Sequence, residues 1–81
     1  MAWFVYIIEC ADGSLYTGVA KDVGKRTQEH NDGKGAKYTR GRTPVTLVYR
    51  EQCDDQSLAV KRELAIKRMS RVEKRRLIED P

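Results

Sequence analysis

Five polar side chains could act as acids, bases or ligands if the fold brought them together. Tyr6 and Tyr16 are phenols on two extended segments, and His30, the only histidine, follows Arg26 by four residues. Residues four apart lie on one face of a helix, which makes a two-residue polar site possible. Arginine holds anions without losing its proton, histidine titrates near neutrality, and the carboxylate of Glu63 suits a hard cation such as Mg²⁺ or Mn²⁺. Such a set could bind an anion and move a proton.

The two tyrosines are predicted to lie on a β-hairpin. Residues 3–10 are rich in aromatic and β-branched residues, and both the odd and the even positions are mostly apolar. This indicates a central strand buried on both faces. Residues 15–19 resume extended character after turn residues at 11–13. The hairpin therefore carries one tyrosine on each strand.

The length of the hairpin loop decides where the tyrosines point. With a three-residue loop and a left-handed Gly13, Cys10 pairs with Ser14, and Tyr6 and Tyr16 project from one face as diagonal neighbours. A two-residue loop would put the tyrosines on opposite faces. We expect the three-residue loop.

Three helices are predicted, each from an N-cap residue and the pattern that follows it. The first runs from the Asp22 cap to about His30, the second over 58–69 after Ser57, and the third over 71–79 after Ser70, which begins a capping box.

The remaining segments complete an α+β fold. A third strand is predicted over 45–51, and an acidic loop follows at 53–56. A chain of 81 residues supports one core, so residues 1–81 should form a single domain. We expect a small three-stranded antiparallel sheet flanked by helices, in the order β-β-α-β-α-α.

Glu63 has an unusual place on its predicted helix. It shares a stripe with Ala59 and Ile66, so a carboxylate lies among packing residues. An ion pair with Arg26 would explain this placement without any cation.

Positive charge is concentrated in the middle of the chain. The net charge is +4, which favours an anionic partner. Residues 21–50 hold eight lysines or arginines and three acids, whereas residues 1–20 hold two acids and no base. The last 31 residues have eight bases and seven acids, a mixture typical of solvated helix faces.

Composition argues against several classes of protein. The longest apolar stretch, residues 2–8, is far below the roughly 20 residues needed to cross a bilayer, and no basic segment precedes it. We therefore expect a cytoplasmic protein with no membrane association. Cys10 and Cys53 fit neither a disulfide framework nor a zinc site, and should be ordinary thiols on or near strands.

The five polar residues lie in a pattern that resembles a known family. The segments Val5-Tyr6-Ile7 and Tyr16-Thr17-Gly18 look like the two halves of the motif that names the GIY-YIG nucleases. Arg26, His30 and Glu63 follow in the order, spacing and type of that superfamily's active site. The resemblance covers residues 5 to about 69, and it is strongest to the small stand-alone bacterial members.

Three departures from the family pattern stand out. Val5 replaces the first glycine of the motif and Thr17 replaces the second isoleucine, but both tyrosines are kept. Many superfamily enzymes also have an asparagine beyond the glutamate, whereas Asn31 of this chain lies well before Glu63. The missing amide bears on how efficient catalysis can be.

The resemblance implies a divalent-metal-dependent endonuclease that hydrolyses phosphodiester bonds in DNA, either structure-selective or non-specific. Glu63 would bind Mg²⁺ or Mn²⁺, and Arg26 would clamp the scissile phosphate. Tyr6 and Tyr16 would orient the attacking water, and either could be the general base. His30 would hydrogen-bond a tyrosine or carry a proton.

A basic loop at 33–42, with about one helical turn, is the predicted nucleic-acid contact. Its basic side chains would follow the phosphate backbone, and its tyrosine could stack on an unpaired base. A merely solvated loop is an equally good interpretation. The predicted contact residues are Lys37, Tyr38, Arg40 and Arg42.

Two other functions fit the same sequence. One is a nucleic-acid-binding module that keeps the fold and has lost the chemistry, and the other is a protein-interaction domain for an acidic partner. No motif that reads base edges is found, so an accessory protein or a homodimer would have to supply any specificity.

Overall fold

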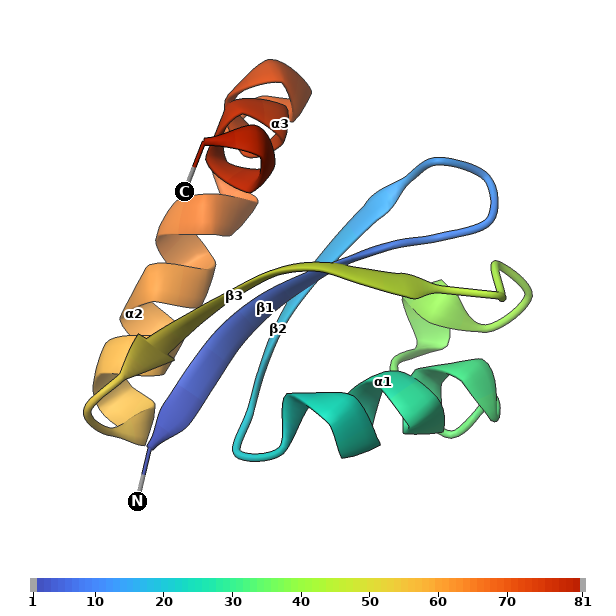
Figure 1. Ribbon diagram of the computed structural model, residues 1–81, viewed down its shortest axis with the longest axis horizontal. Coiled ribbons are helices and arrows are strands. Elements are labelled where there is room, and N and C mark those ends of the chain that lie inside the picture. Colours follow the sequence, from blue (N-terminus) through green and yellow to red (C-terminus); the bar gives the residue numbers. More distant parts are fainter. Residues whose placement is uncertain (1, 81) are drawn as a thin grey trace.

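The computed structural model describes residues 2–80 and has the predicted α+β architecture (Figure 1). A three-stranded antiparallel sheet lies between two layers of helices, and its strand order is β2-β1-β3. The elements are β1 (Trp3–Glu9), β2 (Leu15–Ala20), α1 (Val23–Asn31), the 3₁₀ turn η1 (Lys37–Thr39), β3 (Thr46–Cys53), α2 (Gln56–Lys67) and α3 (Arg71–Glu79). The predicted order β-β-α-β-α-α is confirmed.

The central strand β1 separates two apolar clusters. Tyr6 and Ile8 on one face pack with Val23 of α1, whereas Val5 and Ile7 on the other face pack with α2. All four of these β1 side chains are buried, as expected for a strand that is apolar at both odd and even positions. The helices α1 and α2 therefore lie on opposite faces of the sheet (Figure 1).

The hairpin has the register expected from a three-residue loop. The Cys10 amide donates to the Ser14 carbonyl oxygen over 2.8 Å, and Gly13 has a φ of +83°. Ile8 then pairs with Tyr16, and Tyr6 with Gly18 on β2. Tyr6 and Tyr16 consequently project from the same face of the sheet, the face that α1 covers.

The start of α2 differs from the prediction. The cap is Asp55, whose carboxylate accepts the Leu58 amide over 2.9 Å, so the prediction of Ser57 as the N-cap is wrong. Aspartate caps a helix as well as serine does, and here it comes first along the chain. The helix therefore begins two residues earlier than predicted, and Cys53 belongs to β3 rather than to a loop.

The last helix begins where the sequence predicted and holds the hairpin tip. Ser70 and Glu73 form the full capping box of α3. Arg71 donates to the Gly13 carbonyl oxygen over 2.9 Å, and Arg75 binds Glu9 over 2.6 Å. The hairpin loop is thus anchored on α3.

Two further predictions concern the thiols and the membrane. Cys10 and Cys53 are both free, as expected. In the part of the chain that the structure describes, no helix combines the length and the apolar character that a membrane span needs.

Candidate active site

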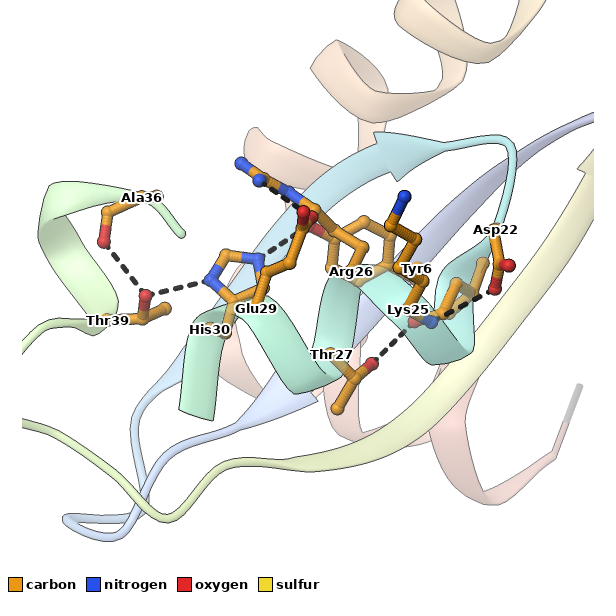
Figure 2. Close-up of polar contacts among 10 residues, drawn as sticks. Tyr6, Asp22, Lys25, Arg26, Thr27, Glu29, His30, Ala36 and Thr39 are labelled. Carbon is orange, nitrogen blue, oxygen red and sulfur yellow. Dashed lines mark hydrogen bonds and ion pairs between the residues drawn. The ribbon is translucent and has the colours of Figure 1, made fainter. Parts of the chain in front are cut away.

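Four of the five predicted site residues meet on the α1 face of the sheet. Tyr16 comes from β2. Figure 2 shows the other three, with Tyr6 on β1 and with Arg26 and His30 on α1. The centroid of the His30 ring lies 6.0 Å from that of Tyr6 and 5.3 Å from that of Tyr16. The helical spacing of Arg26 and His30 turns both toward the tyrosines, as predicted.

A continuous hydrogen-bond chain runs through the buried part of the site. The Tyr6 hydroxyl lies 2.8 Å from His30 Nε2, and His30 Nδ1 lies 2.8 Å from the hydroxyl oxygen of Thr39. That hydroxyl donates in turn to the Ala36 carbonyl oxygen, again over 2.8 Å. Figure 2 shows the chain passing from the sheet through α1 to the loop around η1.

Two glycines leave room for this chain. A Cβ atom at Gly18 would lie 2.6 Å from the Tyr6 hydroxyl oxygen, and one at Gly35 would lie 2.2 Å from His30 Nδ1. Both distances are far shorter than any carbon contact allows. The absence of a side chain at positions 18 and 35 is therefore part of how the site is built.

Burial keeps both central groups neutral. It raises the pKa of Tyr6 to about 12, an effect that hydrogen bonding to Arg26 opposes and that the charge of Glu63 slightly reinforces. Burial also lowers the pKa of His30, and the nearby Arg26 charge lowers it further. At neutral pH the site thus holds an uncharged phenol and an uncharged imidazole.

Arg26 is held at the edge of the site by an acid that the sequence analysis overlooked. Its guanidinium lies 3.3 Å from Glu29, one turn along α1. Burial lowers the pKa of Arg26, but hydrogen bonds to Tyr6 and Glu29 outweigh that effect and raise it. The arginine therefore stays charged, and about a third of its side chain remains accessible.

Glu63 comes from α2 rather than from the α1 side of the sheet, but its charge still acts on the Tyr6 phenol. Among residues 2–80 the ion-pair partner of Glu63 is Lys67, at 3.4 Å. The ion pair between Arg26 and Glu63 that the sequence allowed is not formed, because each residue pairs within its own helix. The side chain of Glu63 is 16% exposed, so part of it contacts solvent.

A single carboxylate is a modest but workable donor set for a hard cation. No group of three histidine, cysteine or acidic residues suited to a metal occurs between residues 2 and 80. Mg²⁺ commonly keeps several waters and takes only one or two carboxylates together with substrate phosphate. Glu63 would fit that pattern as a ligand if it released Lys67.

The basic loop contacts the site through Tyr38. The rings of Tyr16 and Tyr38 are stacked, with centroids 6.0 Å apart, and the Arg42 guanidinium lies 4.3 Å from the Tyr38 ring centroid. Arg42 also pairs with Asp12 of the hairpin loop. Lys37 and Arg40 are exposed. Of the four predicted contact residues, three are thus exposed, and one of these, Tyr38, also belongs with Arg42 to an aromatic and ionic cluster.

Sequence reasoning missed the groups that hold the site in place. Thr39 and Glu29 carry no signal in a single sequence, because a loop threonine and a helix-surface glutamate are ordinary at such positions. Gly35 could have been singled out only as one of several loop glycines. A hollow of about 420 Å³ at α3, lined by Met69, Leu77 and polar neighbours, contains none of the candidate groups.

Comparisons with known proteins agree with this geometry. The GIY-YIG catalytic domain matches residues 2–76. A UPF0213 protein of Desulfotalea psychrophila is 59% identical over 78 residues, covering 95% of this chain and 71% of the relative. A UPF0213 protein of Staphylococcus aureus is 57% identical over 77 residues, covering 95% of this chain and 94% of the relative.

Two solved structures have a similar fold. The solution structure of a UPF0213 protein from Bacillus halodurans has a TM-score of 0.62 and is 46% identical, covering 98% of this chain and 84% of that one. A solution structure from E. faecalis has a TM-score of 0.65 and is 36% identical, with the same coverage. The names of these relatives specify neither an activity nor a substrate.

Proposed function

Because this chain belongs to the GIY-YIG family, we propose that it is an endonuclease that hydrolyses phosphodiester bonds in DNA with the help of Mg²⁺ or Mn²⁺. The observation that carries the proposal is the 2.8 Å contact between the Tyr6 hydroxyl and His30 Nε2. It supplies a path for a proton directly beside Arg26, a group that binds phosphate. Hydrolysis of a phosphodiester needs both functions in one place.

Arg26 would hold the scissile phosphate. Its planar donor fork matches two phosphate oxygens, and its charge stabilises the negative charge that develops on them. In the protein alone the guanidinium is engaged by Glu29, at 3.3 Å. A bound phosphate would therefore compete with Glu29 for the guanidinium. Since partly exposed ion pairs are weak, displacing Glu29 would cost little free energy.

Tyr6 is the better of the two tyrosines for the role of general base. It has an acceptor for its own proton, since its hydroxyl bonds His30. In the reaction a water molecule gives a proton to the Tyr6 oxygen while Tyr6 passes its proton to His30 Nε2. The water oxygen forms the new bond to phosphorus, and the leaving oxygen departs with the electrons of the broken P–O bond and takes a proton from solvent.

Access to Tyr6 requires the site to loosen. Only 1% of Tyr6 is exposed, so the attacking water reaches its oxygen when the side chains above it shift on substrate binding. Tyr16 and Arg26, which are partly exposed, are the side chains in position to shift and to orient that water. Tyr16 is thus assigned an orienting role.

Glu63 is assigned the role of binding the divalent cation through its carboxylate. A divalent ion bound there would supply charge neutralisation at the phosphate and the leaving oxygen. Lys67 is its present partner and would have to release the carboxylate.

The exposed bases of the basic loop, Lys37 and Arg40, are assigned to the phosphate backbone next to the scissile bond. Tyr38 and Arg42 could add stacking and charge once their mutual contact opens. Specificity for a particular DNA structure or sequence is left to a partner protein or a second copy of the chain.

A cleavage assay tests the proposal. Purified protein is incubated with plasmid, forked and single-stranded DNA, with Mg²⁺, Mn²⁺ or EDTA. Metal-dependent cutting is expected, and Glu63→Ala and Arg26→Ala should each slow it by about 10²-fold or more. Glu79→Ala and Arg76→Ala, which remove the same charges from exposed positions on α3, should leave the rate unchanged.

The alternative is a binding module without catalysis. It is favoured by the Glu63–Lys67 ion pair and by the lack of any asparagine after Glu63. Salt-sensitive binding of DNA with no metal-dependent cleavage in that assay would establish it and exclude the nuclease.

A further inference from the structure

The hydrogen-bond chain in the site has a direction that can be deduced by counting protons. The Thr39 hydroxyl oxygen and the Ala36 carbonyl oxygen are 2.8 Å apart. A carbonyl oxygen carries no hydrogen, so the only proton available between them is that of the Thr39 hydroxyl. Thr39 therefore donates to Ala36 and has no second proton to offer to another group.

This direction determines the state of the histidine ring. Because the Thr39 hydroxyl proton is already used, the 2.8 Å contact from Thr39 to His30 Nδ1 needs the proton on the nitrogen. A neutral imidazole protonated on Nδ1 has a bare Nε2. The Tyr6 hydroxyl, 2.8 Å from Nε2, must then be the donor.

The surroundings of His30 leave the ring no other arrangement. His30 and Thr39 are both 0% exposed, so water cannot replace the threonine as a partner. The backbone at Gly35 lies against the Nδ1 side of the ring, where even a methyl group would collide with it. The amide of Thr39 also donates to Ala36, which fixes the short turn that presents the hydroxyl.

We propose that Thr39 is a positioning residue that holds His30 in its Nδ1–H tautomer, so that Nε2 is the nitrogen available to take the proton of Tyr6. The tautomer follows from the contacts alone, whereas its use in catalysis rests on the proposed nuclease function. Once His30 has taken the proton, Nδ1–H still points to Thr39 and Nε2–H points to the Tyr6 phenolate. No hydrogen bond to the ring has to be rebuilt during the transfer.

The opposite tautomer would block the same step. With the proton on Nε2, His30 would donate to the Tyr6 oxygen and could not accept from it. Tyr6 would keep a proton with no acceptor, and the relay would be lost even though every side chain remained in place.

The single histidine makes the tautomer directly measurable. In ¹⁵N-labelled protein at neutral pH, long-range ¹H–¹⁵N spectra contain the ring signals of His30 alone. The wild type and Thr39→Ser are expected to show a protonated Nδ1 and a bare Nε2. Thr39→Val, which removes the acceptor and keeps the shape, should move the proton to Nε2 in most molecules, with amide spectra confirming that the fold is kept.

The outcomes separate this inference from the proposed function. A wild type protonated on Nε2, or a folded Thr39→Val variant with an unchanged tautomer, overturns the assignment, and the wild-type spectrum decides even if the valine variant does not fold. Where the wild type cuts DNA, Thr39→Val should lose about 10²-fold in rate while Thr39→Ser stays near wild type. An inverted tautomer with an unchanged rate would overturn the positioning role and leave the nuclease intact, whereas no cleavage by any variant would refute the nuclease and leave the tautomer standing.

Discussion

At the residue scale, the site depends on keeping two titratable groups uncharged inside the protein. Tyr6 and His30 share a hydrogen bond, and burial shifts the pKa of the phenol up and that of the imidazole down. A charged pair in the resting protein would lose the solvation that water gives to ions, because both side chains are buried. Tyr6 and His30 therefore stay uncharged until a proton is transferred between them.

The lowered pKa of His30 predicts that the folded state loses stability in mild acid. As the pH falls below 6.5 the unfolded chain binds a proton at His30, while the folded chain stays neutral until its own lower pKa is reached. Stability therefore decreases across that interval and is constant above it. The titratable or charged groups around the ring are Tyr6, Tyr16, Arg26 and Glu29, and of these Glu29 opposes the shift.

Urea unfolding of the wild type and of His30→Gln at about pH 7.5 and 5.5 measures this effect. The wild type should lose more stability between the two pH values than the glutamine variant does. An equal loss in both proteins would show that His30 is not the group responsible.

Thr17 gives a second prediction at this scale. Among residues 2–80 its hydroxyl is the buried side-chain oxygen without a hydrogen-bond partner. Thr17→Val removes an unsatisfied group and should raise the free energy of unfolding by about 1 kcal/mol. The same change at Thr39, whose hydroxyl is bonded on both sides, should lower it, so chemical denaturation of the two variants should move the midpoint in opposite directions.

Single residues were predictable from the sequence only where a motif or spacing marked them. The tyrosines, Arg26 and His30 were identified by type and spacing, and the structure places them together. Thr39 could not be identified, because its importance comes from a 2.8 Å contact across a loop rather than from its place in a pattern. The alternative of an Arg26–Glu63 ion pair is not realised, because Arg26 pairs with Glu29 on its own helix and Glu63 with Lys67.

At the scale of elements, the hairpin was predictable and the helix boundary was not. The turn at 11–13 contains a glycine that tolerates a positive φ, and that one feature sets the register of both strands. At the start of α2 the sequence offers two good caps in succession, Asp55 and Ser57. Propensity ranks them equally, so only the hydrogen bond to Leu58 distinguishes them.

The cap assignment can be tested with the two residues themselves. Asp55→Ala should lower the free energy of unfolding by about 1 kcal/mol, because the Leu58 amide loses its acceptor. Ser57→Ala should change it by less than about 0.5 kcal/mol, since Ser57 is an exposed residue of the first turn. Equal losses, measured by chemical denaturation, would contradict the assignment.

At the scale of the whole molecule, both helical layers pair some of their bases with acids, but the excess of positive charge is uneven. On α2 and α3 several bases are engaged by acids, as in the pairs Arg62–Glu51 and Arg75–Glu9. The basic loop beside the site keeps Lys37 and Arg40 exposed. The excess positive charge in the middle of the sequence therefore lies in the layer that contains the site.

This distribution predicts which bases contribute to the salt dependence of DNA binding. Lys37→Gln combined with Arg40→Gln should reduce the slope of log K against log salt concentration by about 2, because two phosphate contacts are lost. Lys61→Gln combined with Arg68→Gln, which change an exposed residue of α2 and its exposed C-cap, should leave the slope unchanged. Binding titrations at several salt concentrations, without metal to prevent cutting, give both slopes.

The anchoring of the hairpin tip has a consequence for the order in which the protein is made. Arg71 reaches Gly13 across 58 positions of sequence, and Arg75 reaches Glu9 across 66. A ribosome completes the hairpin long before it adds either arginine. During synthesis the tip of the hairpin is therefore anchored only after the far end of the chain has been made. A chain cut short before Arg71 would carry its two tyrosines on a hairpin whose tip is not anchored.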